Sequence, residues 1–431
     1  MTEKYYPRLD ETVIWDSLPN GLTVAVVPRK GFRKKLAYFV TNFGSMHTEF
    51  SLDGRNYATP MGVAHYLEHK LFDMPQGEVS SAFAELGASV NAFTSYDMTA
   101  YYFSCTQYFE KNLELLLEFV STPYFPAESV EREKGIIGQE ISMSRDTPDH
   151  RVFEQLMEAM YRHHPVRWPI LGTESSLEEI TPQLLTDCHR AFYCPENMIL
   201  CVVGDVEAST VSEIARRVLG DAPRSCARKL PYPAETPTPE MSGAECAMEV
   251  AMPMFQLGFK CEAVGKGEPA VRQEVIGDLA CEALFGEASE LYLRLYDQGL
   301  IDSSFGGGFE VVDGMSMVTA GGDSDDPEGV RDAILAQAKV LTAQGVEEDQ
   351  LLRLKRSLLG RRIRDLDSFD STCFRICAYH FSEFDYMDFP AVVESITAED
   401  ILEFIHRAIA PANCCLSVIY PLSETNKEVA T

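Results

Sequence analysis

The feature that most constrains the fold is an internal repeat whose period is about half the chain. Six residues of the first half recur 216 positions later in a chain of 431 residues. The first copy is Ile180, Thr181, Pro195, Asn197, Leu200 and Val202, and the second copy is Ile396, Thr397, Pro411, Asn413, Leu416 and Val418. Both copies have the pattern of a helix, a turn and an apolar strand. The repeat therefore predicts two domains of one fold, which also suits a chain too long for one ordinary core.

A polar, proline-rich segment separates the two repeats. Its prolines are Pro223, Pro231, Pro233, Pro237 and Pro239. This composition is typical of an extended linker. We therefore expect an N-terminal domain over residues 1–221, a linker over residues 222–245 and a homologous C-terminal domain over residues 246–431.

The net charge, the apolar runs and the cysteines of the sequence indicate which partners and which compartment to expect. The chain carries 37 Lys and Arg against 66 Asp and Glu, a formal charge of −29, which argues against nucleic acid or anionic lipid as a partner. We find no signal-peptide core in residues 1–20 and no run of apolar residues long enough to span a membrane. The twelve cysteines form no C-x-x-C pair and mostly occupy apolar stretches. We expect buried thiols in a cytoplasmic protein rather than a disulfide framework.

The segment His65-Tyr66-Leu67-Glu68-His69 has the form H-x-x-E-H. On a helix, predicted here over residues 61–72, the first, fourth and fifth of these residues share one face. Both imidazoles can then reach one cation, and Glu68 can reach a water molecule bound to it. Two nitrogens, a carboxylate and an open fourth position suit zinc, and the spacing is that of inverted zinc-peptidase motifs. A chance match to so short a motif is the alternative, so other residues must decide.

A second predicted helix, over residues 126–145, carries Glu133 and Glu140 two turns apart on one face. Such pairs usually lie on solvated surfaces, but three isoleucines at neighbouring positions indicate that part of this surface is buried. A buried carboxylate requires a partner, and a metal ion is one. The matching helix of the second half has Lys355 and Arg362 at these positions, and H-x-x-E-H does not recur. Only the first domain can therefore hold this metal site.

With these residues in place, the chain resembles the pitrilysin-like zinc peptidases, which include insulysin and the mitochondrial processing peptidases. In that family, H-x-x-E-H is followed after roughly 70 to 80 residues by two glutamates with six residues between them; here Glu140 lies 75 residues beyond His65. Further matches are Asn91-Ala92-Phe93-Thr94, Pro169-Ile170-Leu171-Gly172 and residues 193–205. The resemblance extends over the whole chain and is greatest to the short, two-domain bacterial members of the YmfH type.

The resemblance implies an α+β fold of two homologous domains, each a mainly antiparallel β-sheet packed with helices, forming half of a clamshell. It implies a zinc metalloendopeptidase that cleaves peptides or unfolded segments, with one Zn²⁺ per chain bound by His65, His69 and Glu140. Glu68 is then the base that deprotonates the zinc water, and Glu133 orients the site. The edge strand to which the substrate adds as a further strand corresponds to Asn91, Ala92, Phe93 and Thr94.

The chain departs from the family pattern in its second half. Active members usually carry an Arg and a Tyr there, around a Gly-Leu pair, which bind the substrate carbonyl. Matching Gly299-Leu300 to that pair places Tyr296 at the Arg position and Asp302 at the Tyr position. An Asp is a poor oxyanion donor at neutral pH.

Two explanations of this departure stay open. We favour a heterodimer in which this chain is the catalytic subunit and a zinc-less homologous chain supplies the Arg/Tyr pair. The other explanation is a homodimer, or a single chain, that works with weaker carbonyl stabilisation. A different class of function, a non-catalytic peptide-docking or scaffold subunit of the same fold, is disfavoured because every zinc-site residue is present in the first half.

Overall fold

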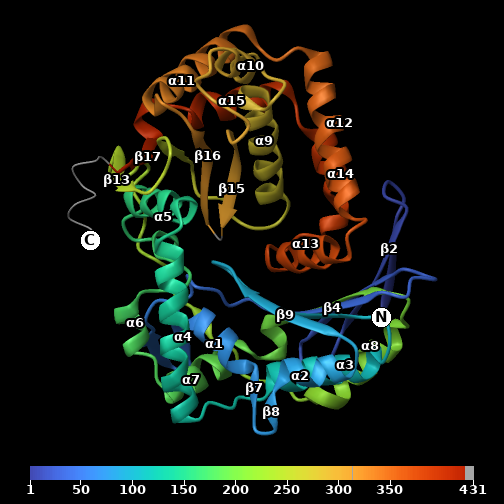
Figure 1. The fold of residues 1–431 in the computed structure, drawn as a ribbon. Coiled ribbons are helices and arrows are strands. Elements are labelled where there is room, and N and C mark those ends of the chain that lie inside the picture. Colours follow the sequence, from blue (N-terminus) through green and yellow to red (C-terminus); the bar gives the residue numbers. More distant parts are fainter. Residues whose placement is uncertain (313, 423–431) are drawn as a thin grey trace. The chain divides into compact units, whose positions relative to one another are not determined.

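The computed structural model describes residues 1–312 and 314–422, which divide into two compact units (Figure 1). Unit 1 comprises Met1–Ile141, Pro169–Pro231 and Arg362–Asp388, whereas unit 2 comprises Ser142–Trp168, Tyr232–Arg361 and the chain from Phe389 onward. Two of the boundaries fall inside long helices, α4 (Ala127–Arg145) and α12 (Glu348–Asp365). Each unit therefore contains a segment from the other half of the sequence.

Unit 1 is built on a seven-stranded sheet with the order β1-β2-β3-β11-β4-β10-β9. The strands are β1 (Thr2–Tyr6), β2 (Glu11–Ser17), β3 (Thr23–Pro28), β4 (Lys35–Thr41), β9 (Ser89–Thr94), β10 (Thr99–Cys105) and β11 (Met198–Gly204). All neighbours are antiparallel except β11 and β3. The apolar segments at residues 22–27 and 36–41 thus lie in one sheet, but β11 separates them because its fully apolar sequence suits the buried centre.

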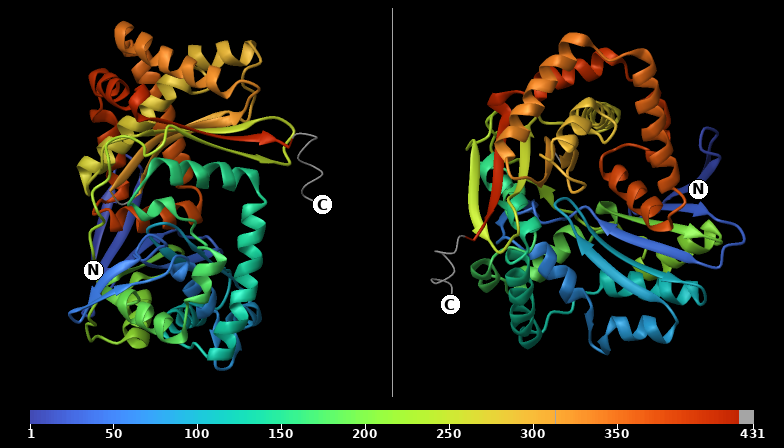
Figure 2. Two further views of the ribbon diagram at one scale, coloured as in Figure 1. Left: turned by 90° about the vertical axis from the view of Figure 1, so that its left-hand side faces the viewer. Right: turned by 45° about the horizontal axis from the view of Figure 1, so that its top comes forward.

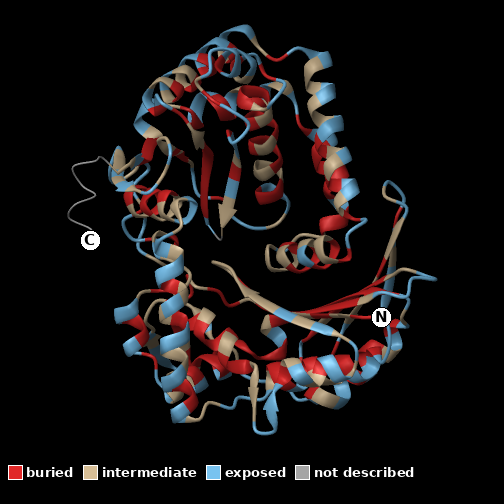
Figure 3. Cartoon of the chain, in the orientation of Figure 1, coloured by how far each residue is buried: buried red, intermediate tan, exposed pale blue. Residues whose placement is uncertain are grey.

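Helices cover the sheet of unit 1 on both faces. They are α1 (Val63–Leu71), α2 (Val79–Glu85), α3 (Phe109–Ser121), α6 (Glu174–Glu178), α7 (Pro182–Phe192), α8 (Ala208–Leu219) and α13 (Phe369–Phe381). Shorter elements are β5 (Glu49–Leu52), β6 (Arg55–Ala58), β12 (Arg228–Lys229), β7 (Asp73–Met74), β8 (Gly77–Glu78), η2 (Pro195–Asn197) and η3 (Tyr386–Asp388). Figure 3 shows that buried residues are concentrated in the central strands and on the sheet-facing sides of the helices.

Unit 2 contains a five-stranded sheet with the order β13-β17-β14-β16-β15. The strands are β13 (Gly243–Met248), β14 (Met254–Lys260), β15 (Gly306–Val312), β16 (Met315–Asp323) and β17 (Cys414–Pro421). The helical elements are α5 (Pro148–Met160), η1 (Pro165–Arg167), α9 (Glu268–Phe285), α10 (Glu290–Asp297), α11 (Pro327–Gln344), α14 (Phe389–Ser395), α15 (Ala398–Ala408) and η4 (Pro411–Asn413). Figure 2 gives two further views of these elements.

The two sheets share one topology. The order β3-β11-β4-β10-β9 in unit 1 matches β13-β17-β14-β16-β15 in unit 2, and in each sheet the first pair is the parallel one. The other neighbours are antiparallel in both sheets. The predicted α+β class, with two homologous, mainly antiparallel sheets packed with helices, is therefore confirmed.

The repeated residues have equivalent local roles in the two copies. Thr181 and Thr397 are the N-caps of α7 and α15, and each side-chain hydroxyl accepts a hydrogen bond from a backbone N–H in the first turn. After each helix a Pro opens a short 3₁₀ turn. Asn197 Nδ2 donates to Phe192 O at 2.9 Å, and Asn413 Nδ2 donates to Arg407 O at 2.8 Å. The repeat was detectable because these caps require particular side chains.

One helix of each sequence half belongs to the unit formed mainly by the other half. Helix α5, from the first half, packs on β13, β14 and β17 of unit 2 (Figure 1). There, Ser417 Oγ donates to Val152 O at 2.7 Å, and Gln155 Nε2 donates to Val418 O at 3.1 Å. Helix α13, from the second half, packs on β4 and β11 of unit 1. Nothing in the proline-rich boundary of the sequence indicated this exchange.

The expectation of free thiols is wrong for one pair of cysteines. Cys194 and Cys226 form a disulfide that attaches the start of the proline-rich segment to the end of α7. The other ten cysteines are free, and most of them are buried. In the part of the chain that the structure describes, no helix combines the length and apolar character that a membrane span requires.

Candidate metal centre

Helix α1 starts where two backbone segments approach closely. Gly62, the residue before the helix, has a φ of 82°, and a Cβ at this position would lie 2.4 Å from Leu171 O. This left-handed conformation and this contact both favour glycine. Ser176 Oγ also donates to Met61 O at 3.0 Å. The Pro169–Gly172 segment, which sequence analysis had singled out, thus fixes the start of the motif helix.

The buried side of α1 consists mainly of Val63, Ala64, Tyr66, Leu67 and Leu71. The hydroxyl of Tyr66 donates to the carbonyl of Val130, which joins α1 to α4. Because apolar side chains occupy this side, His65 and His69 emerge together on the opposite one, with ring centroids 4.5 Å apart.

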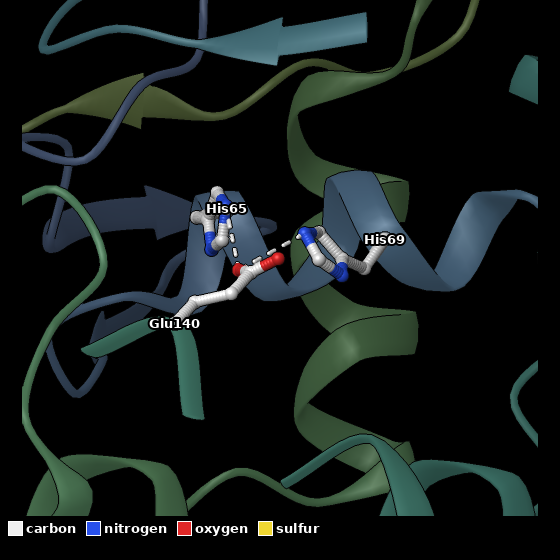
Figure 4. Close-up of side chains that lie close together, drawn as sticks. All are labelled: His65, His69 and Glu140. Carbon is white, nitrogen blue, oxygen red and sulfur yellow. Dashed lines mark ion pairs between the residues drawn. The ribbon is translucent and has the colours of Figure 1, made fainter. Parts of the chain in front are cut away.

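Glu140 on α4 completes a group of three potential metal ligands. Figure 4 shows its carboxylate pointing to both imidazoles. Glu140 Oε2 lies 3.8 Å from His65 Nε2 and 3.6 Å from His69 Nε2. One ligand atom from each residue lies within 4.8 Å of the others, and no second group of three His, Cys, Asp or Glu of this kind occurs among the described residues.

These three residues fit a zinc ion. Zinc bonds of about 2.0–2.2 Å in tetrahedral geometry place neighbouring ligand atoms about 3.4 Å apart, close to the two separations found here. Burial, helped by the neighbouring His69, lowers the pKa of His65 to about 3, so this imidazole is neutral at pH 7. His65 Nδ1 is buried and has no hydrogen-bond partner within the described residues. Two imidazoles with one carboxylate form a donor set that leaves a fourth position open.

Glu133 holds the second histidine in place. Its Oε1 lies 3.1 Å from His69 Nδ1, so the ring nitrogen that faces away from Glu140 has a carboxylate partner. Burial alone would raise the pKa of Glu133, but the His69 hydrogen bond and the Lys70 charge lower it. Burial likewise would lower the pKa of His69, but the bond to Glu133 and the charge of Glu140 raise it. A carboxylate on the outer nitrogen of a metal-binding imidazole fixes the ring orientation.

Glu68 is nearly buried, and its carboxylate has a specific partner. Thr94 Oγ1 donates to Glu68 Oε2 at 2.6 Å. Burial raises the pKa of Glu68, and the Thr94 hydrogen bond opposes that rise. A raised pKa makes a carboxylate a better proton acceptor at neutral pH.

The predicted substrate segment lies on a sheet edge. Strand β9 is the last strand of the unit 1 sheet and pairs only with β10 among the described strands. Asn91 is exposed, whereas Ala92, Phe93 and Thr94 are partly buried. The Phe93 ring lies 6.3 Å from that of Tyr102 and 6.0 Å from that of Phe374 on α13. The segment therefore has the open backbone edge that strand addition requires.

The two unusual residues of the second half are both exposed in unit 2. Tyr296 is the penultimate residue of α10 and stacks on Tyr292, with ring centroids 6.0 Å apart. Asp302 accepts hydrogen bonds from the Ser304 backbone N–H at 2.7 Å and from Ser304 Oγ at 2.6 Å. These bonds lower the pKa of Asp302, which therefore acts as an ionised turn residue rather than as a donor.

Sequence reasoning missed two neighbours of the site. It did not connect Thr94 with Glu68, because strand pairing and helix packing together set that contact. It also passed over Lys70, which is completely buried beside His69. The signal was available, since Lys70 follows Leu67 by three residues and so lies on the apolar side of α1.

Comparisons with known proteins show what the chain is similar to. Residues 54–174 match the family description "Insulinase (Peptidase family M16)", and residues 179–358 match "Peptidase M16 inactive domain". The chain is 37% identical to the protein named "Uncharacterized zinc protease YmfH" of Bacillus subtilis, over 97% of this chain and 99% of that protein. It is 24% identical to the zinc protease PqqE of Helicobacter pylori, over 85% of this chain and 82% of that one.

Solved structures show the same fold. An M16-like peptidase from Alicyclobacillus acidocaldarius is 32% identical and has a TM-score of 0.92, with 96% of this chain and 99% of that chain covered. Pitrilysin is 17% identical with a TM-score of 0.78; 98% of this chain aligns with 46% of the pitrilysin chain, which shows a shared fold alone.

Proposed function

The chain belongs to the insulinase family of peptidases, family M16, and we propose that it is a zinc metalloendopeptidase that cleaves peptides or unfolded segments. One Zn²⁺ per chain binds to His65, His69 and Glu140. The observation that carries the proposal is the convergence of these three side chains from α1 and α4 within 4.8 Å. Two imidazoles and one carboxylate are a ligand set found in catalytic zinc sites.

When bound, zinc supplies a Lewis acid that lowers the pKa of water and polarises a carbonyl group. Glu68 takes the proton from the attacking water and returns it to the leaving amine. The Thr94 hydrogen bond fixes the orientation of the Glu68 carboxylate, and burial strengthens it as a base. Glu133 keeps the His69 ring oriented through Nδ1.

The edge strand β9 binds the substrate backbone. An extended peptide pairs with the backbone groups of Asn91, Ala92, Phe93 and Thr94. This mode of binding recognises the main chain of the peptide more than its side chains. Because Thr94 also contacts Glu68, a peptide paired with β9 has its backbone aligned with the catalytic base. Strand addition takes a peptide in an extended conformation, so unfolded or short peptides are the proposed substrate class.

The proposal includes a partner chain. Tyr296 carries no positive charge at the position of the family's Arg, and the ionised Asp302 offers no hydrogen-bond donor at the position of the family's Tyr. A homologous, zinc-less chain supplies an Arg/Tyr pair in a heterodimer, and a homodimer is the alternative. The cytoplasmic location expected from the sequence remains a prediction, and the Cys194–Cys226 disulfide weighs against it.

A non-catalytic docking or scaffold subunit is the second candidate. Tyr296 and Asp302 favour it, because they replace the carbonyl-binding pair. The intact group of His65, His69 and Glu140 favours the peptidase, because a scaffold has no need to keep three converging ligands.

Zinc analysis and cleavage of an unstructured peptide distinguish the two candidates. We expect one zinc per chain, and cleavage that Glu68→Gln reduces by several orders of magnitude while zinc is retained. The assay is run with the chain alone and with any homologous chain that co-purifies from the native source. Zinc-free protein without cleavage in both assays would favour the scaffold, and normal cleavage by Glu68→Gln would show that the assigned base is wrong.

A further inference from the structure

Lys70 is an unusual residue because its side chain is 0% exposed. It follows His69 directly on α1 and ranks among the largest fully buried side chains of the protein. Lysine is almost never fully buried unless it is paired, since an ammonium group without partners is costly to remove from water. Its position therefore requires a reason beyond packing.

Three polar groups surround the Lys70 ammonium. Nζ donates to Ser129 Oγ at 2.6 Å and to the carboxylate of Asp73. It also lies 3.5 Å from Glu133 Oε2. An ammonium has three N–H donors, and these three groups match that number. Ser129 in turn donates to Asp73, so the partners of Lys70 are themselves connected.

The Glu133 carboxylate lies between two positively polarised groups. Its Oε1 is 3.1 Å from His69 Nδ1, whereas its Oε2 is 3.5 Å from Lys70 Nζ. With one oxygen held on each side, the carboxylate cannot rotate without losing one contact. Its position in turn fixes the plane of the His69 imidazole, whose Nε2 lies 3.6 Å from Glu140 Oε2.

If Lys70 had a purely structural role, its ammonium would not need the contact with Glu133. Asp73 and Ser129 together provide a counter-charge and a hydrogen-bond acceptor, which would satisfy a buried ammonium. The approach to Glu133 adds a contact to the group that holds a metal ligand. Asp73 is also more exposed than Glu133, with side-chain exposures of 35% and 14%, so the attraction to Glu133 is less screened by water.

We infer that Lys70 is a positioning residue of the metal centre: its ammonium holds the Glu133 carboxylate on His69 Nδ1, so that His69 Nε2 is preset to bind zinc. The inference rests on the function proposed above. Lys70 touches neither zinc nor substrate, and acts through Glu133 and then His69. Loss of a group that orients a metal ligand typically weakens metal binding about 10- to 100-fold.

The test compares zinc affinities of apo proteins by competition with a chromogenic chelator. Lys70→Met keeps an unbranched side chain of similar length and removes the charge. We expect zinc binding to weaken about tenfold or more. Lys260→Met is the matched control, because Lys260 is also buried (4% exposed) and ion-paired, with Glu235 at 2.9 Å, but it belongs to unit 2. It should lose stability and keep the wild-type zinc affinity.

A double-mutant cycle separates positioning from general destabilisation. If Lys70 acts through Glu133, Lys70→Met should cause little further loss of zinc affinity in a Glu133→Gln background. Should Lys70→Met not fold, Lys70→Gln carries the same test, because its amide retains donors for Asp73 and Ser129. Wild-type zinc affinity in the folded Lys70 variant, or fully additive losses in the cycle, would overturn this inference. A wild-type protein that binds no zinc would instead overturn the proposed function.

Discussion

Thr94 Oγ1 donates a hydrogen bond of 2.6 Å to Glu68 Oε2. The bond joins the edge strand β9 to the motif helix α1, so the proposed peptide-binding strand and the proposed base share one contact. A peptide that shifts β9 must therefore also shift the orientation of the base. This relationship makes Thr94 the residue at which binding and proton transfer can be tested together.

Thr94→Val removes the hydroxyl but keeps the branched shape. We expect slower peptide cleavage, by about 10- to 100-fold, with unchanged zinc content, because a hydrogen bond to a charged group contributes about 1.5–3 kcal/mol. The measurement is kcat and KM on an unstructured peptide. Thr186→Val, on the exposed side of α7, is the control, since within the described residues its hydroxyl bonds only to Pro182 O. Equal activity of the Thr94 and Thr186 variants would contradict the role of this bond.

Glu140→Gln removes the carboxylate charge from the ligand group. Zinc affinity should fall by more than about 100-fold, because loss of a group that only orients a metal ligand already weakens metal binding by up to about 100-fold. The check is metal content after dialysis, together with chelator competition. Glu131→Gln, on the same helix, removes a carboxylate that pairs with Lys134 at 3.0 Å and should leave zinc binding unchanged. Full zinc content in the Glu140 variant would refute the assigned ligands.

The lowered pKa of Glu235 should make the free energy of unfolding depend on pH. Although burial alone would raise its pKa, the Lys260 ammonium and the backbone N–H groups of His163, His164 and Arg162 lower it to about 2, from an ordinary value of 4.5. Because the folded state holds this carboxylate ionised, its stabilisation is complete above pH 4.5 and is lost as the pH falls toward about 2. A shift of this size is worth about 3 kcal/mol, which solvent screening reduces to about 1–2 kcal/mol.

The test is urea unfolding of the wild type and of Glu235→Gln between pH 7 and pH 2.5. The difference in the free energy of unfolding should be constant from pH 7 to pH 5 and should shrink below pH 4.5. Glu240→Gln is the control, because Glu240 is exposed and lies 3.6 Å from Arg162. A difference that does not change with pH would contradict the assignment.

Because of the Cys194–Cys226 disulfide, we expect the stability of the protein to depend on reductant. Cys194 and Cys226 are 32 residues apart in sequence, and a loop of that length corresponds to about 2–4 kcal/mol. Non-reducing peptide mapping should recover the two cysteines in one linked peptide, and dithiothreitol should lower the free energy of unfolding. Cys226→Ser should be less stable than the wild type without reductant and should not respond to it. A wild type that gives only free thiols at both positions would refute the bond.

The sequence predicted the parts of the fold that depend on special side chains. Thr181, Asn197 and their copies Thr397 and Asn413 cap helices, and a cap requires a particular residue type. The position of β11 between β3 and β4 was not predicted, because apolar strands pair equally well with several partners.

The candidate site was predictable for a similar reason. His65 and His69 stand at a helical spacing that suits one shared metal ion. The choice of Glu140 as the third ligand came from the family resemblance, and the structure brings the three residues together. Their roles, and those of Glu68 and Glu133, stay predictions until they are measured. The Cys194–Cys226 pair and the partners of Lys70 depend on tertiary contacts, which local spacing does not contain. The position of Lys70 on the apolar side of α1, by contrast, is visible in the sequence.

The exchange of α5 and α13 has a consequence for how this chain could arise and be divided. Neither half of the chain contains a complete unit, because each lacks one of the helices that pack on its sheet. The arrangement is that of a helix-swapped dimer joined into one polypeptide, as expected if an ancestral single repeat exchanged this helix between two copies before the copies were fused. Expressed separately, either half would expose an apolar surface and aggregate, whereas the two halves mixed during refolding would restore each other.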